Sequence, residues 1–135
     1  MTHVKFGILL LILLCILGCK INSPASNHEK VIVLTFDDQH ESIYSTAFPM
    51  LDEFGYPSTS FINAERIGLP DQLTWEQVCD LEFNHGWETG GHTLHHINMP
   101  YFDEVTVEYE VQQDKQNIID HGLNPVSFAL RFVAD

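Results

Sequence analysis

From Val31 onward, short apolar runs alternate with stretches in which apolar residues recur at helical spacing. A short, continuous apolar run predicts a buried strand, whereas a repeat near 3.6 residues predicts a helix that packs by one face. On these grounds we expect four strands, at residues 31–36, 58–63, 87–89 and 126–132.

Three helices are expected between these strands, and residues with strong preferences for helix ends mark them. Pro49 suits the first turn of one helix. Residues 74–77 form a capping-box pattern that opens a second helix, and Asp103 can cap a third, longer one. Each helix is followed by a glycine suited to a helix terminus: Gly55, Gly86 and Gly122. The apolar faces are expected at Phe48, Leu51 and Phe54 in the first helix and at Val107, Val111 and Ile118 in the third.

Strict alternation of strand and helix predicts parallel β-α units with right-handed crossovers, that is, an α/β fold. About four such units fit between Val31 and Asp135, whereas a closed β/α barrel needs roughly 200 residues or more. We therefore expect the N-terminal half of a β/α barrel. The apolar edge beyond the fourth strand would need a cover.

The N-terminal segment is typical of a secretory signal. Residues 8–17 form an uninterrupted apolar run behind Lys5, too short to span a bilayer but suited to the core of a signal peptide. The run ends in residues 16–19, Ile-Leu-Gly-Cys, which resemble the cleavage site of a bacterial lipoprotein. There Cys19 would be acylated and become the first residue of the mature protein. An ordinary signal peptide cut nearby and a single anchor helix are the alternatives.

The chain is thus predicted to have three parts: a lipoprotein signal peptide at residues 1–18, a polar tether at 19–30, and a domain at 31–135 that is incomplete at its C-terminus. Lipid on Cys19 would anchor the chain to a membrane of the bacterial cell envelope, with the domain facing the periplasm or the exterior. Because no aspartate follows Cys19, the outer membrane is the favoured destination.

The acidic composition argues against one class of partner. The formal net charge is −13, whereas a nucleic-acid-binding protein needs a basic face to neutralise phosphates. The cysteines exclude another feature: with Cys15 in the signal peptide and Cys19 lipidated, Cys79 is left alone and cannot form an internal disulfide.

Two short polar segments follow predicted strands and carry groups that can bind a metal. Asp37 and Asp38 come directly after the first strand, and His92 and His96 follow the third. Because the carboxyl ends of parallel strands lie at the same end of a sheet, these groups are expected to meet. Two adjacent aspartates are more often a solvated turn or a helix cap, so the combination with the histidines is what indicates a site.

Histidines four residues apart lie on one face of a helical turn, so both rings can reach one ion. With one oxygen of Asp38 they form a two-histidine, one-carboxylate set, which suits zinc or a similar divalent ion and leaves room for water. Such an ion lowers the pKa of bound water from about 15.7 toward roughly 7, and Asp37 could accept the proton. His95 is expected to stay outside the ligand set.

These residues resemble the polysaccharide deacetylases of carbohydrate esterase family 4, also called the NodB homology domain. The family's first motif, Thr-Phe-Asp-Asp-Gly, is matched by residues 35–39, except that Gln39 replaces the glycine. The second motif, His-Ser/Thr-x-x-His, is matched by residues 92–96. The segments at 73–77 and 87–91 are also similar, so the resemblance covers nearly all of the predicted domain.

The resemblance implies a distorted β/α barrel that uses a divalent metal, zinc in the first place, to remove acetyl groups from polymers of N-acetylglucosamine or from acetylated xylan. Asp37 would match the catalytic base and Thr93 a hydroxyl residue that steadies the loop between the histidines. The metal ligands would be Asp38, His92 and His96. The implied partners are the polysaccharide and, through the lipid, a membrane. The alternatives are an envelope lipoprotein that binds metal or glycan without turnover, and a structural lipoprotein in which the histidines are incidental.

The chain also departs from the family's pattern. The third motif ends in Pro-Tyr/Phe-Gly, whereas Arg131 and Val133 stand at the proline and glycine positions. The fourth motif and the fifth, which supplies a catalytic-acid histidine, have no counterpart. The resemblance therefore concerns the part of the domain that carries the base and the metal ligands.

Overall fold

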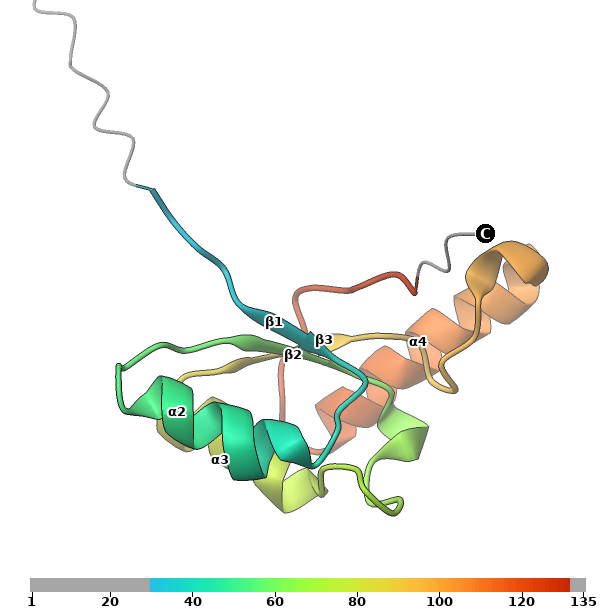
Figure 1. Cartoon of the computed structure of the whole chain (residues 1–135). Helices are drawn as coiled ribbons and strands as arrows, with labels where there is room; N and C mark the ends of the chain where they lie inside the picture. Colours follow the sequence, from blue (N-terminus) through green and yellow to red (C-terminus); the bar gives the residue numbers. More distant parts are fainter. Residues whose placement is uncertain (1–29, 132–135) are drawn as a thin grey trace, which may run out of the picture. The chain divides into compact units, whose positions relative to one another are not determined.

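Three parallel strands form the sheet in the order β1, β2, β3, with helices packed against it (Figure 1). The computed structural model describes residues 30–131, of which those from Ile32 onward make one compact unit. The strands are β1 (Thr35–Asp37), β2 (Thr59–Ile62) and β3 (Glu88–Gly91). Because consecutive strands pair in parallel and are joined by helical crossovers, the predicted α/β fold is confirmed.

The first strand is shorter than expected. The prediction of a buried strand over residues 31–36 is wrong in its first half, where three apolar residues are exposed: Val31, Ile32 and Val33. Pairing with β2 begins only where the Thr59 N–H donates to the Leu34 carbonyl (3.0 Å). Within residues 30–131, β1 is an edge of the sheet. The apolar residues before it therefore have no neighbouring strand in the described part of the chain to pack against.

The chain between β1 and β2 is helical, as expected, but begins with a wider turn. A π-helical turn at Ile43–Ala47 leads into α2 (Phe48–Asp52), with Pro49 in the first turn of α2. Two of the three predicted apolar residues pack against the core. The third, Phe54, lies beyond the end of α2, where it is exposed and stacks on Tyr56.

Both longer helices begin at the predicted caps. In front of α3 (Trp75–His85), the Gln77 N–H donates to the Thr74 hydroxyl and the Thr74 N–H donates to the Gln77 side chain, which completes the capping box. In front of α4 (Glu104–Asp120), the Asp103 side chain accepts a hydrogen bond from an N–H of the first turn. A short 3₁₀ turn, η2 (Ala64–Arg66), follows β2. A second one, η3 (Met99–Tyr101), follows the loop after β3.

The buried face of α4 differs from the prediction. An apolar face at Val107, Val111 and Ile118 was expected from the spacing, but the buried residues of the helix are Glu110, Asp114 and Ile118. Two acids thus point from α4 into the protein. The hydrophobic core beside them draws on the sheet, α3, α4 and the connecting segments: Ile43, Ile62, Ala64, Leu73, Val78, Leu81, Trp87, Leu94, Ile118 and Leu123.

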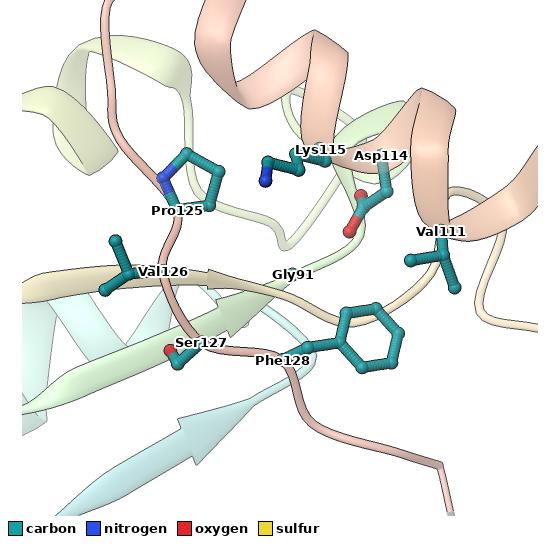
Figure 2. A pocket seen from close by; sticks show the side chains of 8 residues that line it. All are labelled: Gly91, Val111, Asp114, Lys115, Pro125, Val126, Ser127 and Phe128. Atoms are coloured by element: carbon teal, nitrogen blue, oxygen red, sulfur yellow. The ribbon is translucent and has the colours of Figure 1, made fainter.

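The predicted fourth strand is reduced to a single bridge beside β3. Within the described part of residues 126–132, Phe128 pairs in parallel with Gly91 (Figure 2). The Gly91 N–H donates to the Ser127 carbonyl (3.1 Å), and the Ala129 N–H donates to the Gly91 carbonyl (2.9 Å). A Cβ at position 91 would lie 2.8 Å from a carboxylate oxygen of α4 and 3.0 Å from the Phe128 ring, so the close approach needs glycine. The same segment and α4 line a pocket of about 230 Å³.

The predicted signal peptide, Cys19, nearly all of the tether, and Val133 lie outside the described residues. Over residues 30–131, no helix combines the length and the apolar character that crossing a membrane requires.

Candidate metal centre

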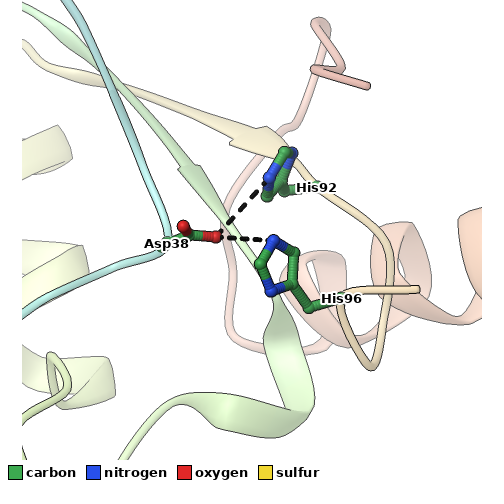
Figure 3. Close-up of side chains that lie close together, drawn as sticks. All are labelled: Asp38, His92 and His96. Atoms are coloured by element: carbon green, nitrogen blue, oxygen red, sulfur yellow. Dashed lines mark ion pairs between the residues drawn. The ribbon is translucent and has the colours of Figure 1, made fainter. Parts of the chain in front are cut away.

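Three of the predicted site residues meet at one point (Figure 3). Oδ1 of Asp38 lies 2.9 Å from Nε2 of His96 and 3.6 Å from Nε2 of His92. One ligand atom from each residue lies within 4.8 Å of the other two. Two imidazoles and a carboxylate are brought together from segments far apart in the chain, as the order of the strands predicts.

A sharp turn after β1 separates the two adjacent aspartates. β1 ends at Asp37, which is exposed and lies outside the cluster. Asp38 (φ 68°) and Gln39 (φ 39°) both adopt left-handed backbone conformations, which aspartate tolerates better than most residues. The turn leaves the Asp38 carboxylate with the histidines, whereas the Asp37 carboxylate is exposed to solvent.

The prediction that the two histidines share a helical turn is wrong. The segment after β3 has no regular structure, and both Thr93 (φ 71°) and His96 (φ 62°) have left-handed backbone conformations. The two imidazole rings still lie side by side, with centroids 5.1 Å apart. Thr93 is buried, and its hydroxyl accepts a hydrogen bond from the Ile97 N–H (3.2 Å), which braces the loop from within. Such conformations cost about 1–3 kcal/mol each and persist only where the surroundings support them.

Two buried carboxylates of α4 supply part of that support. Asp114 accepts hydrogen bonds from the backbone N–H groups of His92 (2.9 Å) and Ala64 (2.8 Å). Glu110 accepts one from the backbone N–H of His95 (2.9 Å) and lies 2.7 Å from Nδ1 of the same ring. The histidine loop is therefore pinned to α4 at both ends, and His95 is turned away from the cluster, as expected.

The carboxyl group of Asp114 is held in an unfavourable place for a charge. Burial raises its pKa from 3.8 to about 6, although the hydrogen bonds that it accepts from two backbone N–H groups lower the pKa. Desolvation thus outweighs hydrogen bonding at this group. Without this carboxylate the buried Ala64 N–H would have no acceptor, and the His92 N–H would keep only the Ile62 carbonyl.

Asn63, the first residue after β2, supports the loop from the other side. Its side chain is fully buried, and its Nδ2 donates to the carbonyls of His92 (2.6 Å) and Thr93 (2.8 Å). N–H and C=O groups of the loop are therefore both satisfied by side chains, although the loop belongs to no helix or strand.

A hydrogen bond behind the ring fixes the tautomer of His92. Its Nδ1 lies 2.9 Å from the carbonyl oxygen of Ala129. Because a carbonyl can only accept, Nδ1 carries the proton and Nε2, which faces Asp38, keeps its lone pair in the neutral ring. Histidines that ligate metals are commonly held in this way.

His96 lies between one carboxylate and two cations. Nη1 of Arg66 is 3.4 Å from its Nδ1, and Arg131 donates to its backbone carbonyl (2.9 Å). Burial lowers the pKa of His96, and the charges of Arg131, His92 and Arg66 lower it further, against the opposite effect of Asp38. These effects together favour the neutral ring, which is the form that can bind a metal.

The surroundings of Asp38 also fit a cation. Its Oδ1 is buried and has no hydrogen-bond partner among the described residues, only the two nearby histidine nitrogens. Buried anionic oxygens are normally satisfied. Two neutral imidazoles and one carboxylate oxygen are ligands typical of zinc, so the residues present fit a divalent ion.

Three residues that shape this site are not found by the sequence analysis: Asn63, Glu110 and Asp114. A signal for two of them exists, because Glu110, Asp114 and Ile118 recur every four residues, which is the spacing of a single helix face. Asn63 follows the carboxyl end of β2, at the end of the sheet where the ligands gather. Its position just after a parallel strand is the same signal that indicates Asp38 and the histidines.

Comparison with known proteins identifies the family. The family model described as polysaccharide deacetylase matches residues 25–132. The chain belongs to the polysaccharide deacetylase family. It is 34% identical over 71 residues to YxkH of Bacillus subtilis (strain 168), and 31% identical over 80 residues to the poly-beta-1,6-N-acetyl-D-glucosamine N-deacetylase of Escherichia coli (strain K12). These matches cover 53% and 48% of this chain but only 25% and 12% of the relatives.

Solved deacetylase structures share the fold. The deacetylase PplD of Streptococcus pyogenes, in complex with acetate, superposes with a TM-score of 0.71 at 22% identity, over 76% of this chain and 46% of that chain. IcaB from Ammonifex degensii gives a TM-score of 0.65 at 24% identity, over 75% and 50%. The described sheet thus corresponds to part of a larger β/α barrel, which confirms the predicted half barrel.

Replacing Asn63 with aspartate should destabilise the protein. The new carboxylate would face the carbonyl oxygens of His92 and Thr93 in place of a donor, so two buried hydrogen bonds would become repulsions. We expect the free energy of unfolding to fall by at least about 2 kcal/mol, since an unsatisfied buried group costs roughly 1–3 kcal/mol and a charged one more. Urea unfolding of the full chain, followed by circular dichroism, measures the change.

The matched control is Asn84→Asp. Asn84 is exposed on α3, where its side chain donates to Asp80. The same chemical change there should cost less than about 1 kcal/mol, because solvent screens the new charge. Equal losses in the two variants would show that Asn63 does not support the loop.

Proposed function

We propose that this chain carries the metal-binding and base-bearing part of a hydrolase that removes acetyl groups from a polysaccharide. The observation that supports this function is the convergence of Asp38, His92 and His96 in a member of the polysaccharide deacetylase family. The name of the Escherichia coli relative favours a polymer of N-acetylglucosamine as the substrate. Acetylated xylan is the second substrate class to test.

Asp38, His92 and His96 would hold one divalent ion, which we propose to be zinc. When bound, such an ion supplies Lewis-acid chemistry, which polarises a carbonyl and makes water reactive near neutral pH. The protein's part is to present neutral rings: the Ala129 carbonyl keeps the proton of His92 on Nδ1, and burial lowers the pKa of His96. His92 thus presents the lone pair of Nε2 toward Asp38, and the lowered pKa favours the neutral form of His96.

Asp37 would act as the base. Its carboxylate is exposed at the end of β1, next in the chain to a proposed ligand, so substrate and water can reach it. It would take a proton from the water whose oxygen attacks the acetyl carbon. The bond from that carbon to the sugar nitrogen then breaks, and acetate and an amino sugar are released. The leaving nitrogen would receive its proton from Asp37 or from solvent.

We further propose that Cys19 carries a lipid that anchors the domain in the bacterial envelope. The support is the sequence of residues 16–19 after an apolar run of signal-peptide length. A polar tether of about a dozen residues would let the domain reach polymer near the membrane. The residues that follow Cys19 favour the outer membrane as its location.

Loss of a proposed ligand should weaken metal binding. We expect His92→Ala and His96→Ala each to raise the zinc dissociation constant by more than the roughly 10–100-fold typical of losing an outer-shell partner. Competition with a chromophoric chelator measures the constant, and elemental analysis of dialysed protein measures the zinc content. His95→Ala is the control, because its ring is half-exposed and bound to Glu110. Equal zinc content in all three variants would contradict the ligand set.

Loss of the base should stop turnover but spare the metal. With zinc bound, Asp37→Asn should lower acetate release from an N-acetylglucosamine oligomer by about 10²–10⁴-fold, the usual contribution of a positioned base. Zinc affinity should stay within about twofold, because Asp37 lies outside the cluster. Unchanged acetate release would exclude Asp37 as the base. Zinc binding without acetate release by the unaltered chain would favour a lipoprotein that binds metal or glycan without turnover.

The anchor is tested by Cys19→Ser. If Cys19 is acylated, this variant should remain an uncut precursor and take up no fatty-acid probe when it is expressed in a bacterium. Processing to the same mature mass in the variant would instead indicate an ordinary signal peptidase.

A further inference from the structure

We propose that Gln39, Asn63 and Gln72 form a buried amide relay that positions the two metal-binding segments relative to each other. The proposal rests on the metal site proposed above. It assigns a role to Gln39, which stands where the family's first motif has glycine, and it makes Gln39 a positioning residue that acts through its neighbours.

Gln39 follows the proposed ligand Asp38 directly and is fully buried. Its Oε1 accepts a hydrogen bond from the Asn63 backbone N–H (2.8 Å), and its Nε2 donates to Oε1 of Gln72 (2.9 Å). The Asn63 N–H can only donate, so the orientation of the Gln39 amide is fixed by that contact, and its Nε2 must face an acceptor. Its backbone carbonyl accepts from the Leu73 N–H (2.9 Å). Every polar group of this side chain is therefore used.

Asn63 continues the path to the second segment. While its backbone donates to Gln39, its side chain donates to the carbonyls of His92 and Thr93. A ligand on one loop is thus joined to a ligand on the other by Gln39 and Asn63 alone, although the two loops are far apart in the sequence. The Asn63 amide nitrogen and backbone N–H are both used, although its Oδ1 has no partner among the described residues. Buried hydrogen bonds of this kind restrict the groups that they connect.

The backbone of Gln39 shows what the side chain contributes. Its φ of 39° lies in the left-handed region, which glycine adopts freely and glutamine does not. Glycine at this position would remove the backbone strain and would still allow the chain to form the turn. A glutamine here is therefore unfavourable for the turn itself, and its compensation is the pair of amide hydrogen bonds to Asn63 and Gln72.

The decisive variant is Gln39→Gly in the full chain, because it removes both amide hydrogen bonds and leaves the backbone of the turn unstrained. If the relay positions the ligands, zinc should bind about 10–100-fold more weakly, the range found when groups that orient ligands are lost. The visible absorption spectrum of the cobalt-substituted variant should also differ from that of the unaltered protein, since it reports the geometry of the ligands. The urea midpoint of the metal-free variant should also fall, because the Asn63 N–H and the Gln72 side-chain oxygen lose a partner and relief of backbone strain offsets only part of that loss.

Two further variants complete the test. Gln72→Met leaves the Gln39 amide without its acceptor, so it should weaken zinc binding in the same direction but less. Gln77→Ala is the matched control: it also removes a glutamine that accepts a backbone N–H, in the capping box of α3. It should lower the urea midpoint and leave zinc affinity and the cobalt spectrum unchanged.

The outcomes separate the relay from the metal site. Zinc affinity and a cobalt spectrum like those of the unaltered protein in both Gln39→Gly and Gln72→Met would overturn the relay alone. Absence of zinc binding by the unaltered chain would overturn the proposed metal site and the relay with it. Weakened binding in Gln77→Ala, equal to that in Gln39→Gly, would show a general effect of stability and would also overturn the relay.

Discussion

Buried peptide groups need hydrogen-bond partners, and the loop after β3 finds only some of them in the backbone of a neighbouring strand or helix. With Thr93 and His96 in left-handed conformations, its backbone follows a path that no regular ladder accompanies. Its other partners are side chains from other elements: Asp114 and Glu110 from α4, and Asn63 from the end of β2. The positions of both proposed histidine ligands depend on these contacts, so the site is as rigid as the elements that supply them.

The same requirement accounts for the composition of α4. A helix packed on a sheet usually buries an apolar stripe, but here the stripe contains Glu110 and Asp114 above Ile118. Burying Asp114 is costly, as its raised pKa shows, and an apolar residue would pack there without that cost. It would also leave the Ala64 N–H without an acceptor and the His92 N–H with the Ile62 carbonyl alone. The helix therefore gives up part of its apolar face to hold the loop.

The segment that follows α4 takes part in the site although it pairs with β3 at one bridge only. The Ala129 carbonyl sets the tautomer of His92, and Arg131, at the motif's proline position, donates to the His96 carbonyl. Both contacts come from the segment that the resemblance aligns with the family's third motif. In this chain that motif acts on the proposed ligands through a backbone oxygen and an arginine. The matched part of this chain covers about half the length of the solved deacetylases with the same fold.

Local signals in the sequence were sufficient for features whose cause is local. The capping box at residues 74–77, the cap at Asp103 and the alternation of strands and helices follow from preferences of neighbouring residues, and the structure has all of them. The meeting of Asp38 with the two histidines followed from one topological rule, that parallel strands end at the same edge. For these features no knowledge of distant contacts was needed.

Other features depend on partners that hydrophobic periodicity cannot identify. The apolar residues 31–33 resemble a buried strand but are exposed, because burial requires a neighbour on the free edge of β1. The spacing of the two histidines matches a helix, yet their loop is irregular because Asn63 and the acids of α4 stabilise conformations that are unfavourable in isolation. Gln39 is similar, since its left-handed backbone is compensated by amides far away in the chain. Hydrogen bonds between distant segments set the geometry of the site, and the periodicity of apolar residues along the chain does not reveal which distant residues will form them.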